Sequence, residues 1–128
     1  MLELLRSARG SAAVDFLLVG TLVTAMFLGL LQLGFDLHVR NVLAAAAADG
    51  ARFGANADAT PQDGADLANS LIRHALGPRY AQAVVVSGQA IDGAQLVTIR
   101  VTTQLPLLAG FLPALQISVV GRALAESR

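Results

Sequence analysis

FLLVGTLVTAMFLGLLQLGF, residues Phe16 to Phe35, is the stretch around which the rest of the chain is organised. A helix needs about twenty apolar residues to cross the hydrocarbon core of a bilayer. This run supplies that length without a charged residue, and it therefore predicts a membrane-spanning helix. A secretory signal would have a shorter apolar region with a cut after it. The small residues of AAAAADGARFGA, which follow the run, lie too far from its end to favour that alternative.

Composition limits what the remaining chain can do. The protein has 128 residues, of which 55% are hydrophobic, so only a small exported part remains beside the span. Nine basic and nine acidic groups cancel, which gives no basic patch for nucleic acid. There is no cysteine for disulfide or thiol chemistry. We expect neither a cofactor nor a small-molecule substrate.

The segment that precedes the span sets its orientation. Residues 1–10 carry Arg6 and Arg9 against a single acid, Glu3. Positive segments tend to stay on the cytoplasmic side of a membrane. We therefore expect a cytoplasmic N-terminus and an exported C-terminal part.

Asp15 stands immediately before the apolar run. Acids within or beside membrane spans are functional candidates, because a carboxylate that faces lipid is costly. The residues alone favour a plainer interpretation, an interfacial acid in the first helical turn that is stabilised by the helix dipole and by headgroups.

Small residues recur at intervals of four within the span, at Gly20 and Thr24 and again at Ala25 and Gly29. This small-xxx-small spacing lets helices approach closely in lipid. It is a weak indication of helix packing.

The helix is expected to continue beyond the membrane, from about Ala12 to about Phe53, as a stalk. The Ala44 to Ala48 run has high helix propensity. The apolar stripe predicted for this part consists of Val39, Leu43, Ala46, Gly50 and Phe53. The alternative is a membrane helix and a separate surface helix, with a break near Gly34.

A second helix is predicted over residues 63–76. Thr60 is a good N-cap and Pro61 fits the first helical position, while Gly77-Pro78 ends the helix. Its packing stripe is predicted to contain Ala65, Ala68, Leu71, Ile72 and Ala75.

From Ala81 onward the pattern alternates, which predicts three strands in a meander. They fall at residues 83–87, 97–103 and 115–120, with Asp92-Gly93 in the first turn. The second helix or the stalk should cover one face of this sheet. The apolar, proline-bracketed Leu105 to Leu115 segment is expected to be a loop. It could pack into the small core or contact the membrane surface or another subunit, and partner contact is slightly favoured.

Catalytic and metal motifs are weak in this sequence. His38 and His74 lack further ligands at metal spacing. Asp66, Ser70 and His74 share one predicted helix, whereas a triad needs groups that converge from different elements. We therefore expect no enzyme and no metal site.

The block RGSAAVDF, Arg9 to Phe16, resembles the processing site of the TadE-like pseudopilins of the tight-adherence pilus system. The apolar span and the small-residue helix that ends in ARFGA are also similar to that family. Beyond about Phe53 the likeness is architectural only.

The resemblance implies a type IV pilin-like protein that a prepilin peptidase cuts between Gly10 and Ser11, with Arg6 and Arg9 in the basic leader. It further implies that Asp15, where the family pattern has glutamate, pairs with the amino terminus of a neighbouring pilin-like subunit during assembly. Two opposite charges in a low-dielectric zone would set the axial register of apolar helices.

The expected architecture is therefore an α+β, single-pass membrane protein. It has a leader (1–10), a transmembrane helix (11–35), a stalk continuation (36–54) and an exported domain (55–128) with a helix and a small antiparallel meander. The expected function is that of a minor pilin or pseudopilin in pilus assembly or secretion, located in the cell membrane or incorporated in an extracellular pilus. The rival is a membrane-anchored extracytoplasmic binding module that does not polymerise.

Overall fold

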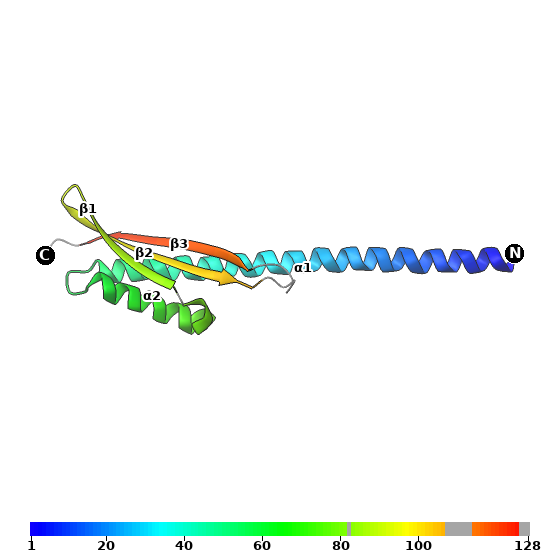
Figure 1. The fold of residues 1–128 in the computed structure, drawn as a ribbon, viewed down its shortest axis with the longest axis horizontal. Coiled ribbons are helices and arrows are strands. Elements are labelled where there is room, and N and C mark those ends of the chain that lie inside the picture. The colour runs from blue at the N-terminus through cyan, green and yellow to red at the C-terminus, as the bar shows by residue number, and fades with distance from the viewer. Residues whose placement is uncertain (82, 107–113, 126–128) are drawn as a thin grey trace. The chain divides into compact units, whose positions relative to one another are not determined.

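The computed structural model describes residues 1–81, 83–106 and 114–125, without the side chains of residues 4–8. Its elements follow the predicted α+β order (Figure 1). They are, in chain order, α1 (Leu2–Gly54), α2 (Pro61–Leu76), the short 3-10 helix η1 (Pro78–Tyr80), β1 (Ala83–Ile91), β2 (Ala94–Leu105) and β3 (Leu115–Leu124). The chain divides into two compact units, Met1–Phe35 and Asp36–Arg128, which are described separately below.

Helix α1 is longer than the sequence indicated. It begins at Leu2 instead of near Ala12 and ends at Gly54. Most residues of the leader are good helix formers and it contains no proline, so nothing in it stops the helix. The helix also runs through Gly34 without interruption, so the alternative with a break at that glycine is wrong.

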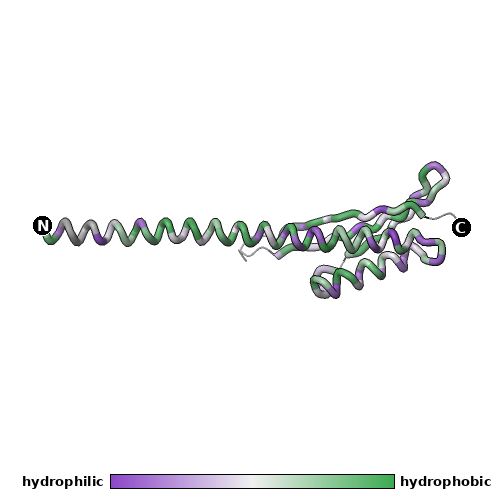
Figure 2. Tube along the Cα trace, turned by 180° about the vertical axis from the view of Figure 1, so that it is seen from behind, coloured by the Kyte–Doolittle hydropathy of each residue, from purple (hydrophilic) through white to green (hydrophobic). Residues whose placement is uncertain are grey.

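In the first unit, the apolar side chains of α1 are exposed on every side of the helix. Phe16 is 77% exposed, Leu22 70% and Leu30 61%. Figure 2 shows that hydrophobic residues predominate along this half of the helix. A helix that is apolar all round needs lipid or other helices around it.

Helix α2 begins at Pro61, two residues before the predicted range but directly after the predicted N-cap Thr60, and it ends at Leu76 as predicted. Thr60 Oγ1 accepts a hydrogen bond from the Asp63 backbone N–H (3.2 Å), and the Thr60 N–H donates to Asp63 Oδ2 (2.8 Å). This reciprocal pair is a capping box, which satisfies donors that the first turn leaves free. Gly77, with φ 97°, donates its N–H to the Arg73 carbonyl at the other end.

The three strands form an antiparallel meander in the order β1-β2-β3, as predicted. Ile91 pairs with Ala94 around the Asp92-Gly93 turn. Both turn residues have positive φ, 50° and 84°, which is the geometry of a type I′ hairpin. β1 extends to Ile91, four positions beyond the predicted end at Ser87, because this tight turn lets pairing continue to the hairpin tip.

The core of the second unit lies between one face of the sheet and both helices, α2 and residues 36–54 of α1. The sequence left open which of the two would cover the sheet, and both do. The buried cluster contains Val39, Leu43, Ala46, Ala47 and Ala51 from α1, Ala68 and Ile72 from α2, and Ala81, Ile99, Val101, Leu105, Ile117 and Val119 from the remaining chain.

Glycines let the backbones of this unit come close together. A Cβ on Gly50 would lie 2.8 Å from the Ala68 Cβ and would collide with the carbonyl oxygen of Gly64. On β3, a Cβ on Gly121 would collide with the α1 backbone at Ala47. The small residues of α1 therefore let α2 pack closely on one side of this helix and β3 on another.

Several predicted core positions are exposed. Phe53 is 43% exposed, because the buried stripe of α1 passes through Gly50 to Gly54 instead. Leu71, at 37%, and Ala75 also face outward, since Gly64, Ala65, Ala68 and Ile72 form the buried side of α2.

The segment predicted as an apolar loop, Leu105 to Leu115, starts and ends in strands. Leu105 closes β2 and is fully buried, so the prediction was wrong for that residue. Leu115 opens β3 and is 49% exposed. Residues 107–113 lie outside the described residues, and the partner contact predicted for this segment stays a prediction.

Candidate processing and assembly site

Gly10 and Ser11 lie within α1, and both are exposed. A Cβ added to Gly10 would meet nothing within 4 Å, and the positive-φ glycines are Gly77 and Gly93. Neither packing nor backbone conformation among the described residues thus requires glycine at position 10. A requirement for glycine there would have to come from a molecule that binds this segment.

Of the two basic residues of the leader, the structure describes the side chain of Arg9 only. Arg9 lies directly before Gly10 and is exposed, so its guanidinium is accessible to a partner. Arg6 also lies in α1, but its side chain is outside the described ones.

Asp15 is exposed and lies one helical turn after Ser11, so the two residues share a face of α1. Its neighbours Val14 and Phe16 are 55% and 77% exposed. Within the described residues the Asp15 carboxylate has no hydrogen bond or ion pair. A carboxylate on an otherwise apolar surface is available to a cationic partner.

The spacing of charges along α1 matches a bilayer. At a rise of 1.5 Å per residue, an ideal helix rises about 32 Å from Asp15 to Asp36, against a hydrocarbon thickness of about 30 Å. The Arg9–Gly54 part of α1 is long and apolar enough to cross a membrane. This spacing would put Asp15 at one edge of the hydrocarbon.

The hydroxyls inside the apolar segment are satisfied by the helix itself. Thr21 Oγ1 donates to the Leu17 carbonyl (2.7 Å) and Thr24 Oγ1 to the Gly20 carbonyl (2.8 Å). Added Cβ atoms at Gly20 and Gly29 meet nothing within 4 Å, so these surfaces are open. At 3.6 residues per turn, the Gly20/Thr24 pair and the Ala25/Gly29 pair lie about 140° apart around the helix. The two pairs therefore do not form one stripe, and they present small residues to two directions.

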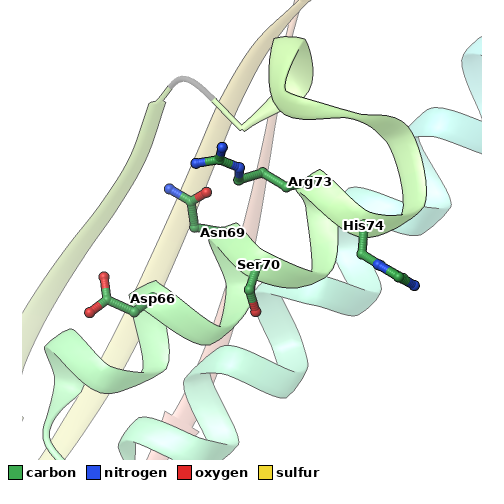
Figure 3. Close-up of a pocket in the computed structure, with 5 residues that line it drawn as sticks. All are labelled: Asp66, Asn69, Ser70, Arg73 and His74. Atoms are coloured by element: carbon green, nitrogen blue, oxygen red, sulfur yellow. The ribbon is translucent and has the colours of Figure 1, made fainter.

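The polar side of α2 is the other place where reactive groups gather. Asp66, Asn69, Ser70, Arg73 and His74 line a shallow open hollow there (Figure 3). The Ser70 hydroxyl donates to the Leu67 carbonyl at 2.8 Å. In Figure 3 the His74 ring points away from Ser70, so the two do not form a nucleophile and base pair. Among the described residues, no group of three or more His, Cys, Asp or Glu side chains is placed to hold a metal ion.

The comparison with protein families identifies the N-terminal part of the chain. Residues 10–52 match the family of TadE-like proteins. The TadE-like segment starts at Gly10 and includes Ser11, Asp15, the apolar run and the small residues of α1 up to Arg52. This confirms the resemblance drawn from the sequence over these residues. TadE-like proteins are non-enzymatic, pilin-like proteins of the tight-adherence pilus, and the match extends this likeness to residues 10–52 of the chain. The comparisons with curated proteins and with solved structures found no match.

Sequence reasoning missed part of what the TadE-like segment does in the fold. It assigned Gly50 to an apolar stripe, whereas the structure uses this residue for the close approach of α2. The sequence does contain a signal for this close approach: Gly50 and Gly54 lie one turn apart on the same face of the helix. Gly64 was not singled out, because a lone glycine near a helix start is common.

Proposed function

We propose that this protein is a TadE-like minor pilin or pseudopilin that a prepilin peptidase processes between Gly10 and Ser11. The observation that carries the proposal is the family match over residues 10–52, which begins at the glycine in question. The open surroundings of Gly10 support it, since nothing among the described residues requires glycine there.

Cleavage would change the charge at the mouth of the apolar helix. It would remove Glu3, Arg6 and Arg9 and create an amino group on Ser11 with an ordinary pKa of about 8. This group would be cationic at neutral pH. Ser11 and Asp15 would then place a cation and an anion one turn apart at the end of the helix.

The new amino group is a suitable partner for Asp15 of an adjacent subunit. Opposite charges about 4 Å apart attract by about 4 kcal/mol at an effective dielectric constant of about 20. Apolar helices can slide past one another at little cost, so such a pair would fix their axial register. The exposed apolar side chains of the first unit would supply the remaining contact area.

The proposal places the N-terminus in the cytoplasm and residues 36–128 outside the membrane. The exported unit would be held by the span before assembly and displayed on a pilus or a priming complex after it. The partners would be the prepilin peptidase, other pilin-like subunits and the assembly machinery.

The intact mass of the protein isolated from its native host membrane tests this proposal. A mass that corresponds to a chain starting at Ser11, with or without one methyl group, is the expected result. A mass that includes residues 1–10 would refute processing and favour a membrane-anchored binding module. A chain that starts beyond Phe35 would show a secreted protein and refute the membrane assignment as well.

A further inference from the structure

The sheet has one face on the core and one face that no described element covers. Along β2 and β3, outward-facing side chains alternate with buried ones, and on β1 the exposed Val85 lies between the half-buried Val84 and Val86. Val85 on β1 is 59% exposed, and Val120 and Leu124 on β3 are 39% and 65% exposed. Val85 and Val120 lie on either side of the central strand β2, and apolar side chains at this exposure on one sheet face are typical of an interaction surface.

Among the described residues, two arginines are the only charged ones on this outer face. Arg100 pairs in register with Val85 and Val120, and Arg122 pairs with Thr98, so the two arginines are diagonal neighbours on β2 and β3. Both are exposed, and neither forms an ion pair within the described residues. The face is therefore cationic and partly apolar.

The opposite charge gathers at the start of α2. Asp58 lies in the turn before the helix, and Asp63 and Asp66 lie in its first turns, all of them exposed. Asp63 is engaged with Thr60 in the capping box. Asp58 and Asp66 have no ion-pair partner among the described residues. Because α2 packs on the core face of the sheet, this acidic patch and the two arginines occupy different surfaces of the same unit.

We propose that the outer face of the sheet docks on the acidic start of α2 in a second copy of this chain. The contact joins two different surfaces, so each copy keeps one surface free for the next, and the contact can repeat along a polymer. Two outer faces in contact would instead place arginines against arginines, which is unfavourable. The inference rests on the proposed function, and it names the surfaces through which the exported units meet.

Crosslinking of the full-length chain tests the contact, and the absence of native cysteine makes single engineered cysteines unambiguous. Ser118→Cys marks the outer face and Gln62→Cys marks the start of α2, and both positions are exposed. Differently tagged copies are expressed together in the native host and treated with a bismaleimide. We expect Ser118→Cys to join Gln62→Cys at least fivefold more than it joins itself. His74→Cys, near the other end of α2, is the matched control and should give little product.

Charge reversal then tests the chemistry of the contact. Arg100→Glu with Arg122→Glu in the Ser118→Cys copy should reduce the mixed product at least fivefold. Asp58→Arg with Asp66→Arg in the Gln62→Cys copy should restore it. Asp63 is left unchanged because it caps α2.

Three results would overturn the inference. The main product could be Ser118→Cys joined to itself, or a crosslink to another protein only. The yield of the mixed product could also stay the same when the charges are reversed. Intact mass of the same samples separates the two proposals. Chains that start at Ser11 without the mixed product refute this contact alone, whereas chains that retain residues 1–10 refute the proposed processing.

Discussion

A side chain on Gly64 would run into the backbone of Gly54, because a Cβ there would lie 2.9 Å from both the N and Cα atoms of that residue. Gly54 is the last residue of α1, and Gly64 lies in the first turn of α2. The crossing of the two helices is therefore a contact between backbones, and it fixes how closely α2 approaches α1.

Gly64→Val should destabilise the exported unit. The new side chain must push α2 away from α1, and overpacking of this kind costs about 1–3 kcal/mol. Thermal unfolding of the full chain in detergent, followed by circular dichroism, measures the loss. Gly88→Val is the matched control, since a Cβ at Gly88 meets nothing within 4 Å. Equal melting temperatures for the two variants would contradict the close crossing.

Thr60→Ala should lower the stability of the exported unit by about 1 kcal/mol, the usual cost of losing an N-cap side chain. The variant loses the acceptor that the Asp63 N–H uses and the hydroxyl that donates to Asp63 Oδ2 (2.7 Å). Ser70→Ala serves as the control, because it removes an exposed hydroxyl from the middle of the same helix. A loss as large in Ser70→Ala would mean that the capping box has no special effect.

The capping box also makes stability depend on pH. Hydrogen bonds from the Thr60 side chain and backbone hold the pKa of Asp63 below its ordinary value. The stabilisation is therefore complete above about pH 4, the pKa of Asp in an unfolded chain, and is lost as the pH falls through the lowered folded value. Asp63→Asn should weaken the fall in melting temperature between about pH 6 and about pH 3. An unchanged pH profile in that variant would show that other carboxylates dominate.

Replacing Gly10 by phenylalanine should block maturation without unfolding the protein. The site is open, so a large side chain fits the structure but changes the segment that the peptidase must bind. We expect the unprocessed chain to accumulate in the membrane, detected by intact mass. Gly20→Phe, another open glycine of α1, should be processed normally. Normal processing of the Gly10 variant would count heavily against a prepilin-type site.

Asp15→Asn should separate processing from assembly. The variant keeps the size of the side chain and removes its charge, so cleavage at Gly10 should proceed while subunit pairing fails. Loss of a pair worth more than about 1.4 kcal/mol reduces association more than about tenfold. The measurement compares the amount of protein in sheared surface fractions and in membranes. Asp15→Glu should assemble, and full assembly of Asp15→Asn would exclude the charge pair.

The sequence was sufficient wherever a local signal decides the structure. The apolar run, the Thr60 cap, the Gly77-Pro78 stop and the alternating valines each predict one element, and those elements are present. Positions decided by contacts between elements were harder to predict. Phe53 and Leu71 look like core residues, but the helix crossing at Gly50 and Gly64 turns other sides of α1 and α2 inward. The candidate site depends on Gly10, Ser11 and Asp15, whose neighbours in the structure are few, so the family match supports it more than packing does.

The hydroxyls of the two threonines in the apolar segment are already hydrogen-bonded within the helix, which matters if the helix moves from lipid into a pilus. Thr21 and Thr24 already donate their hydroxyls to carbonyls of the preceding turn. On the proposed function, they would need no new partner when the helix moves from lipid into a bundle of other helices, or when it returns. Asp15 is the only ionisable side chain between Gly10 and Asp36. Transfer between membrane and polymer would thus be reversible for most of this helix, and its direction would be decided by whether one carboxylate meets a cation or water.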